Sequence, residues 1–328
     1  MKPVKIATVA LVTLAVGAAA LCAQTPPPAP GRPSPDPDGA KIVTEDIARF
    51  WEAFDHAGPA YSAETFQKVY LDRGTPGLRD FLTLRIQSAE TLAKAVQTHP
   101  KYYASIRNST GRIREMEKEI RASFYALKYL VPDAVFPDVY FVVGVLNSGG
   151  TTSDRGLLIG AEMYGRTPDS PTAELSPWLM TVLSPVEKIP HIVAHELIHY
   201  QQKEPKAEPT LLSQSLYEGT ADFVGELISG RQINQAAHAY AEPRRAELWR
   251  EFKEKMHGKD LAGWLYSSSG DRPHDLGYWM GYEIVKAYYD RAADKRKALK
   301  EILEVQDYDA FLAKSGYAER FAAPKPAS

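Results

Sequence analysis

One ten-residue segment, HIVAHELIHY at His191–Tyr200, constrains the fold of this chain more than any other. Its apolar residues cover most of a helix surface, which predicts a buried helix, yet three histidines and one glutamate interrupt them. His195 and His199 are four residues apart and would therefore project from the same face of that helix. Because a polar stripe on a buried helix needs a compensating partner, a shared metal ion is the first interpretation to consider.

The segment contains an H-E-x-x-H pattern, and each of its polar positions has a chemical use. Two imidazoles one turn apart can bind Zn²⁺, and Glu196 beside them can act as general base on a metal-bound water. His191 cannot join His199 on the same ion, because their separation along a helix is about 12 Å and a Zn–N bond is about 2 Å. His191 is therefore expected near the centre or at the surface. A hydrogen-bonded histidine pair without metal remains the alternative.

A third ligand is predicted on the next apolar helix, LLSQSLYEGTADF. It carries Glu218 and, four residues later, Asp222, so both would point the same way. Glu218 can bind the metal, and Asp222 can accept a hydrogen bond from the free ring nitrogen of a ligand histidine. Two carboxylates on so apolar a helix would be costly without a cation, although a solvated acidic face is the alternative. The sequence thus predicts one zinc ion held by His195, His199 and Glu218, with one position left for water.

The spacing of these residues resembles that of the gluzincin metallopeptidases, the group that includes thermolysin and the aminopeptidase N type. Eighteen residues separate His199 from Glu218, as in the H-E-x-x-H-x18-E pattern of the aminopeptidase type. Most of residues 45–290 also resembles a bacterial group of zinc-dependent peptidases described as a domain of unknown function, with gliding-motility relatives. The segments that carry this second resemblance are FWEAFD, YLDRGTPGLRDFLTLRI, the glycine-rich stretch at 144–162 and DLGYWMGYEIV.

The resemblance implies two further parts of a peptidase site. A strand beside the zinc helix would pair with an extended substrate, and Leu158–Met163 is the candidate, although a plain hairpin strand is equally consistent. A downstream side chain would stabilise the oxyanion. Tyr278, sixty residues after Glu218, is the first candidate, with His274 and Tyr282 as alternatives. Their helical spacing is also typical of residues that pack in a core.

The rest of the pattern predicts a mostly helical α+β fold. Helical spacing dominates 44–130, two β-branched segments lie at 139–146 and 157–164, and helical spacing returns after Pro185. We therefore expect a zincin-like domain with a small antiparallel sheet or hairpin beside the zinc helix. The predicted parts are a helical part at 41–135 and a zinc-peptidase core at 136–320. The core would contain the hairpin at 138–163, the zinc helix at 190–203, the third-ligand helix at 209–229, and C-terminal helices near 243–256, 274–292 and 295–305.

The N-terminus predicts export. A basic start precedes the apolar run Ile6–Leu21, so residues 1–23 are interpreted as a signal peptide cleaved after Ala23, with an uncleaved anchor as the alternative. Cys22 is the only cysteine and offers a lipid anchor, which Leu21 disfavours because lipoprotein signals have a small residue there. Residues 24–40 are rich in proline and are expected to form a linker, with folding starting near Ile42.

These observations together predict an exported zinc metallopeptidase, periplasmic or extracellular, acting on a peptide or protein substrate. A formal net charge of −2 without a basic cluster argues against nucleic acid as a partner, and membrane contact is expected only through the signal or an anchor. Two alternatives stay open: an envelope protein whose zinc has a structural or interaction role without turnover, and a helical binding module without metal. Cleavage specificity and oligomeric state are not predicted.

Overall fold

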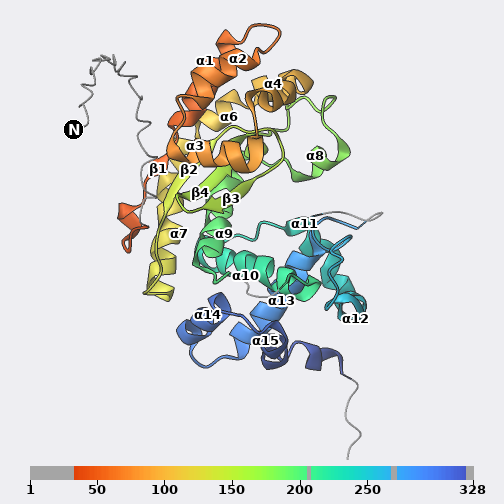
Figure 1. The fold of residues 1–328 in the computed structure, drawn as a ribbon. Helices are drawn as coiled ribbons and strands as arrows, with labels where there is room; N and C mark the ends of the chain where they lie inside the picture. The colour runs from red at the N-terminus through yellow and green to blue at the C-terminus, as the bar shows by residue number, and fades with distance from the viewer. Residues whose placement is uncertain (1–32, 205–207, 267–271, 323–328) are drawn as a thin grey trace, which may run out of the picture. The chain divides into compact units, whose positions relative to one another are not determined.

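The computed structural model describes residues 33–204, 208–266 and 272–322 (Figure 1). The predicted signal peptide and residues 24–32 of the predicted linker lie outside these ranges. Residues 33–40, also assigned to the linker, pack on the folded domain instead. Ser34 pairs with Phe136 in an isolated β-bridge, and the Arg121 guanidinium donates hydrogen bonds to the carbonyl oxygens of Pro37 and Ala40. The folded domain therefore begins earlier than the proline content indicated, because these backbone groups find partners on it.

The sheet has four strands in the order β1-β2-β4-β3. They are β1 (Ile42–Val43), β2 (Asp138–Val142), β3 (Gly150–Ser153) and β4 (Gly156–Gly160). The predicted α+β class is confirmed, but the predicted antiparallel pairing within 138–163 is wrong for its two main strands. β2 and β4 run parallel, with Val139 opposite Leu157, and only β3 is antiparallel to β4. Both main strands are almost wholly buried, which is typical of parallel strands, and a buried apolar run does not reveal strand direction.

This strand order also corrects the predicted substrate-pairing strand. The segment Leu158–Met163 begins in β4, which lies between β2 and β3 and has no free edge. The edge strand beside it is β3, whose sequence GTTS carries no apolar alternation that could have marked it as a strand.

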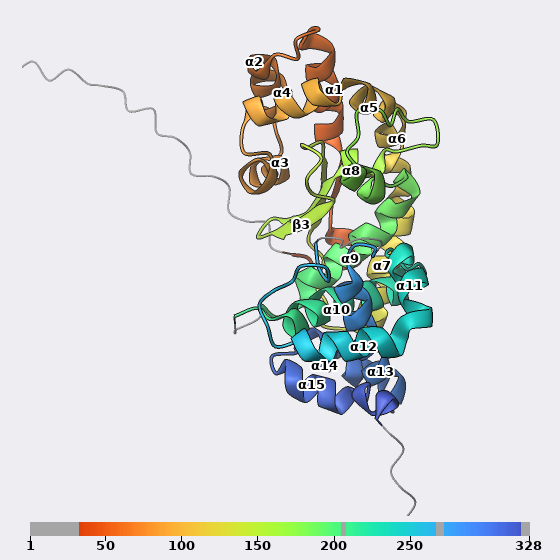
Figure 2. The same ribbon diagram turned by 90° about the vertical axis from the view of Figure 1, so that its right-hand side faces the viewer.

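Helices before β2 cover the sheet from the N-terminal part of the chain (Figures 1 and 2). α1 (Glu45–His56) and α3 (Pro76–Phe81) contact the strands, α4 (Ala89–Thr98) packs on neighbouring helical segments, and α7 (Glu117–Leu130) packs mainly on helices that follow the sheet. Within the stretch of helical spacing at 44–130, residues 76–98 form α3, a π-helical turn at Leu82–Ile86 and α4. A break lies at Gln87, whose φ of 72° is incompatible with a right-handed helix.

Three helices after the sheet build the lower part of the domain in Figure 1: α9 (Ile189–Gln201), α10 (Leu211–Ser229) and α13 (Leu276–Arg291). α10 packs on both α9 and α13. Its contact with α13 is backbone to backbone, because a Cβ on Gly281 would lie 1.6 Å from the Ser215 carbonyl oxygen. The glycines Gly219 and Gly281 therefore set how closely these two helices approach.

The remaining helices are α2 (Ala63–Thr65), α5 (Pro100–Ser105), α6 (Arg107–Gly111), α8 (Pro177–Val182), α11 (Gln235–Ala241), α12 (Arg245–Lys255), α14 (Lys295–Leu303) and α15 (Tyr308–Ser315). Within the described ranges, no helix combines the length and the apolar character that crossing a bilayer requires.

Candidate metal centre

Helices α9 and α10 form the centre because both are buried along most of their length. Pro190 occupies the first turn of α9, where backbone amides have no partner within the helix, so its lack of an amide hydrogen costs no hydrogen bond. α10 begins at Thr210, whose hydroxyl accepts a hydrogen bond from the Ser213 amide at 3.2 Å, and ends at Gly230 with a φ of 78°. These residues set where each helix begins or ends.

Three side-chain atoms converge between the two helices. The Nε2 atoms of His195 and His199 are 3.0 Å apart, and Glu218 Oε2 lies 3.1 Å from His199 Nε2 and 3.6 Å from His195 Nε2. Tetrahedral zinc with bonds of about 2.0–2.1 Å would space its ligand atoms by about 3.3 Å. The observed distances lie on either side of that value. The three side chains therefore form a group that could bind a metal ion.

The remaining ring nitrogens determine which atoms are free to bind. His195 Nδ1 lies 2.9 Å from Asp222 Oδ1, and His199 Nδ1 lies 2.7 Å from Gln202 Oε1. The Gln202 amide is oriented by its own NH₂ group, which donates to the Tyr217 carbonyl oxygen at 2.9 Å. Both Nδ1 atoms lie beside acceptors, which favours the hydrogen on Nδ1 of each ring and a lone pair on each Nε2.

The Nε2 atoms of both histidines and one Glu218 oxygen are then all acceptors, and no other described side chain donates a hydrogen bond into the space between them. Burial alone would raise the pKa of Glu218, but the two neighbouring histidines outweigh it and hold that pKa well below its usual range. Burial alone would lower the pKa of His195, but Asp222 and Glu218 raise it well above its usual value. Positive charge is thus favoured at this point, and either a proton or a divalent cation can provide it.

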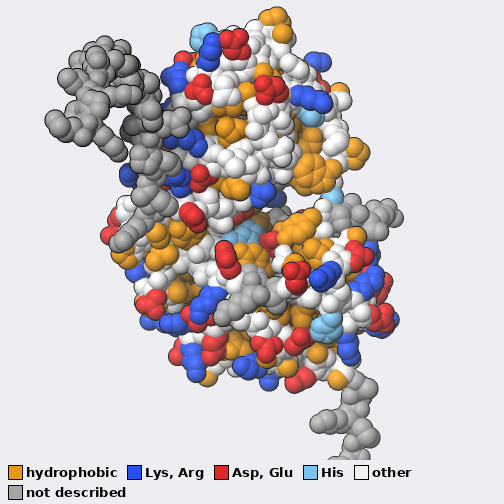
Figure 3. All heavy atoms as spheres, in the orientation of Figure 1, with side chains coloured by type: hydrophobic (Ala, Val, Ile, Leu, Met, Phe, Trp, Pro, Cys, Tyr) orange, Lys and Arg blue, Asp and Glu red, His pale blue; other side chains and the backbone are white. Residues whose placement is uncertain are grey.

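The centre lies at one side of a cleft of about 500 Å³. Figure 3 shows pale-blue histidine atoms in a hollow on this face. The Tyr266 hydroxyl donates to Glu218 Oε1 at 2.8 Å, and the Tyr278 ring stacks on His195 with centroids 6.2 Å apart. Glu196 also lines the cleft, where burial raises the pKa of its carboxyl although the two histidines oppose that shift.

The structure brings together most of the residues that the sequence singled out. His195, His199 and Glu218 converge, Asp222 lies behind His195, and Glu196 lies beside the group. Their assignments as ligands, ligand-orienting group and general base stay predictions.

The other candidates lie at different distances from the centre. Tyr278 lines the cleft, whereas His274 lines a neighbouring cleft of about 370 Å³. Tyr282 points elsewhere and donates to Glu226 at 2.8 Å. His191 is not among the converging residues in the described part of the chain.

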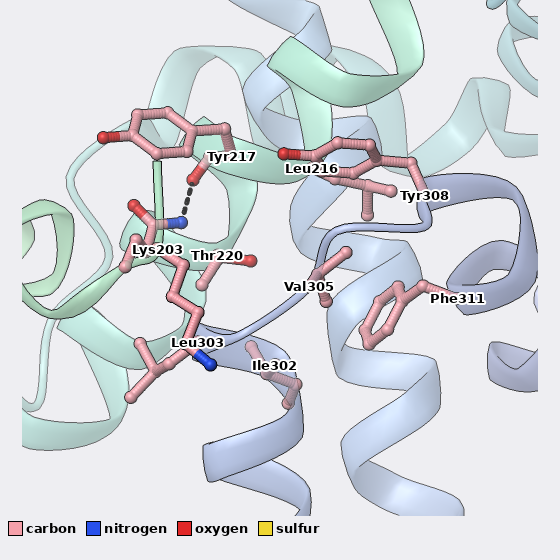
Figure 4. Close-up of a pocket in the computed structure, with 10 residues that line it drawn as sticks. Lys203, Leu216, Tyr217, Thr220, Ile302, Leu303, Val305, Tyr308 and Phe311 are labelled. Atoms are coloured by element: carbon pink, nitrogen blue, oxygen red, sulfur yellow. Dashed lines mark hydrogen bonds between the residues drawn. The ribbon is translucent and has the colours of Figure 1, made fainter. Parts of the chain in front are cut away.

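Three residues near the centre escaped the sequence analysis. Gln202 follows His199 by three residues, so helical spacing could have revealed it. Asn234, which donates to Asp222 Oδ2 at 2.6 Å, and Tyr266 come from loops with no periodic pattern. Figure 4 shows Tyr217 and the dashed hydrogen bond to its carbonyl group, at a small pocket closed by apolar side chains that include Leu303 and Val305. Gln202 is thus held against a packed region.

One protein family matches most of the chain. The family described as gliding motility protein GldB matches residues 34–256 and 265–319. No curated protein and no solved structure matches the chain.

This match corrects the function predicted from the sequence. The expected link to gliding-motility proteins is confirmed, but the predicted function as a zinc-dependent peptidase is wrong, because the matched family is a gliding-motility family and not a characterised peptidase family. Two adjacent helices bring the two histidines and the glutamate together, and such a group can bind a metal in a protein that does not hydrolyse peptides. The non-catalytic alternative fits the match better.

Proposed function

The chain belongs to the gliding motility protein GldB family, and from this premise we propose that it is a cell-envelope protein with a non-catalytic metal centre. One zinc ion would be held by His195, His199 and Glu218. The ion would stabilise the contact between α9 and α10 and would leave one coordination position facing the cleft. The role is one of structure and binding, without turnover.

One observation carries the metal-binding part of this proposal. Both Nδ1 atoms lie within 2.7–2.9 Å of acceptors, and with their hydrogens there the two Nε2 lone pairs and one carboxylate oxygen meet within 3.0–3.6 Å of one another. Three acceptors at such distances repel one another unless a cation lies between them. Two imidazoles and a carboxylate are ligands that zinc commonly takes in proteins.

The envelope location is supported by the family and by the N-terminal sequence. The run Ile6–Leu21 follows a basic start, and Cys22 comes directly after it. The family is one of lipoproteins, which favours Cys22 as the point of lipid attachment over cleavage after Ala23. We include this anchored form in the proposal.

The Asp222→Asn variant is expected to bind zinc about 10- to 100-fold more weakly than the wild type, because groups that orient a ligand histidine contribute on that scale. The change keeps the shape of a buried side chain and removes the charge 2.9 Å from His195 Nδ1. Competition with a chromophoric chelator measures the affinity. Glu226→Gln is the matched control, since Glu226 lies on the same helix and accepts from Tyr282 away from the centre. Equal zinc affinities in the wild type and Asp222→Asn would contradict the expectation.

Metal content and peptide turnover test the proposed function together. We expect the purified full-length chain to hold about one zinc ion per molecule, and to cleave a peptide library no faster than the metal-free chain. Glu196→Gln should retain the metal, because Glu196 lies outside the converging group. A chain without metal would overturn the proposal. Peptide cleavage that Glu196→Gln abolishes, with zinc still bound, would overturn its non-catalytic part.

A further inference from the structure

The cleft beside the metal centre contains one cation of the chain itself. Arg85 is the only Lys or Arg among the described side chains that line it. It comes from the π-helical turn Leu82–Ile86, just before the helix break at Gln87.

Arg85 is held in place by the loop that carries β3. Its Nη2 donates to the Thr151 hydroxyl at 2.9 Å, and its main-chain oxygen accepts from the Asn147 amide at 3.0 Å. The same loop touches the centre, because a Cβ on Gly150 would lie 2.4 Å from Glu196 Oε1. Arg85, the loop and Glu196 are therefore contiguous along one wall of the cleft.

Among the described residues, the guanidinium of Arg85 forms no salt bridge, although it is near enough to Glu196 to lower the pKa of that carboxyl. Its Nε is buried and has no hydrogen-bond partner, and no carboxylate of the described residues lies within ion-pair distance. A buried donor without an acceptor is costly and rare in folded proteins. Buried arginine nitrogens usually donate to an acceptor. For Arg85, a ligand in the cleft could supply that acceptor.

The charges that line the cleft also favour an anionic ligand when a divalent ion occupies the centre. Among the groups that line the cleft, the metal and Arg85 would then bring three positive charges against the two carboxylates Glu196 and Glu218. Asp222 lies behind His195 and outside the lining. The other polar lining groups include the hydroxyls of Ser148 and Thr152 and the amide of Asn147. Neutral donors and an excess of positive charge on the lining itself favour an anionic ligand over a neutral or cationic one.

We propose that the cleft binds an oxyanion, a carboxylate or a phosphate group, between the metal centre and Arg85. Guanidinium groups recognise both kinds of anion through charge-assisted hydrogen bonds. This inference rests on the proposed metal centre and names the class of ligand that the centre takes. Thr151 acts as a positioning residue, because it orients the guanidinium through Nη2.

Cobalt(II) in place of zinc provides the test, since its visible absorption changes with the ligands that it binds. The full-length cobalt-loaded chain is titrated with succinate and, separately, with inorganic phosphate. We expect at least one anion to change the spectrum, and the anion that acts at the lower concentration identifies the group. In Arg85→Gln we expect the dissociation constant to rise about 10- to 100-fold, the scale of a hydrogen bond to a charged group.

Two further variants separate the outcomes. Arg85→Lys keeps the charge without the planar group and should lose less affinity than Arg85→Gln. Arg79→Gln, an exposed arginine in α3, is the control and should bind the anion like the wild type. The inference is overturned if a chain that holds cobalt responds to neither anion, or if Arg85→Gln binds as tightly as the wild type. A wild-type chain that takes up no cobalt overturns the proposed metal centre itself.

Discussion

The His199→Ala variant is expected to bind zinc more than 100-fold more weakly than the wild type, a larger loss than the roughly 10- to 100-fold attributed to ligand-orienting groups. His199 Nε2 lies 3.0 Å from His195 Nε2 and 3.1 Å from Glu218 Oε2, so it contacts both other members of the group. Its removal would leave only two protein ligands, and structural and catalytic zinc sites use at least three. Chelator competition at fixed pH measures the change.

The matched control is His191→Ala on the same helix. His191 is partly buried, and burial lowers the pKa of its imidazole, but it lies outside the converging group. We expect His191→Ala to keep the zinc affinity of the wild type. Equal affinities for His199→Ala and His191→Ala would contradict the ligand assignment.

Substitution of Gly281 by alanine is expected to lower the free energy of unfolding by at least about 3 kcal/mol, the upper end of the cost of overpacking. The new Cβ would lie 1.6 Å from the Ser215 carbonyl oxygen, which is backbone and cannot rotate away. α10 and α13 would have to separate. Because α10 also carries Glu218, the same substitution should weaken zinc binding. Urea denaturation monitored by circular dichroism measures the stability.

Gly111→Ala provides the control for this substitution. Gly111 is also a helical glycine, at the end of α6, and a Cβ there would meet no atom within 4 Å. Its replacement should change stability by less than about 1 kcal/mol, as exposed substitutions usually do. A Gly281→Ala variant as stable as Gly111→Ala would show that α10 and α13 do not cross as closely as described.

The sequence predicted those parts of the centre that depend on helix periodicity. His195 and His199 share a face because they are four residues apart, and Glu218 and Asp222 do so for the same reason. The apolar flanks of both segments indicated burial, and burial brought the two polar faces together. Periodicity also sufficed for the α+β class, since long helical stretches enclose one short β-branched region.

Other parts depend on contacts that no local pattern encodes. The direction of β4 relative to β2 follows from the route of the chain between them, and two buried apolar strands look alike in either direction. Tyr266 reaches the centre, and Arg85 reaches the cleft beside it, from segments more than forty residues away from any of the converging residues. Tyr278 was found because it lies on a helix, whereas its neighbour Tyr282 has the same spacing and faces Glu226.

The function could not be predicted from the local sequence pattern alone. A pattern of two histidines and two glutamates describes a local geometry, and that geometry can bind an ion in a protein that hydrolyses nothing. The family match along most of the chain favours the alternative without turnover, because it links the chain to gliding-motility proteins. Site geometry thus bears on whether the chain binds a metal, and family membership bears on its biological role.

Anomalous diffraction at the zinc absorption edge, from crystals of the zinc-loaded chain, tests the metal centre most directly. The account predicts one anomalous peak at about 2.0–2.2 Å from His195 Nε2, His199 Nε2 and a Glu218 oxygen, which are the bond lengths of zinc to such ligands. A difference map without a peak between these three side chains, or with zinc bound only elsewhere on the protein, would contradict it.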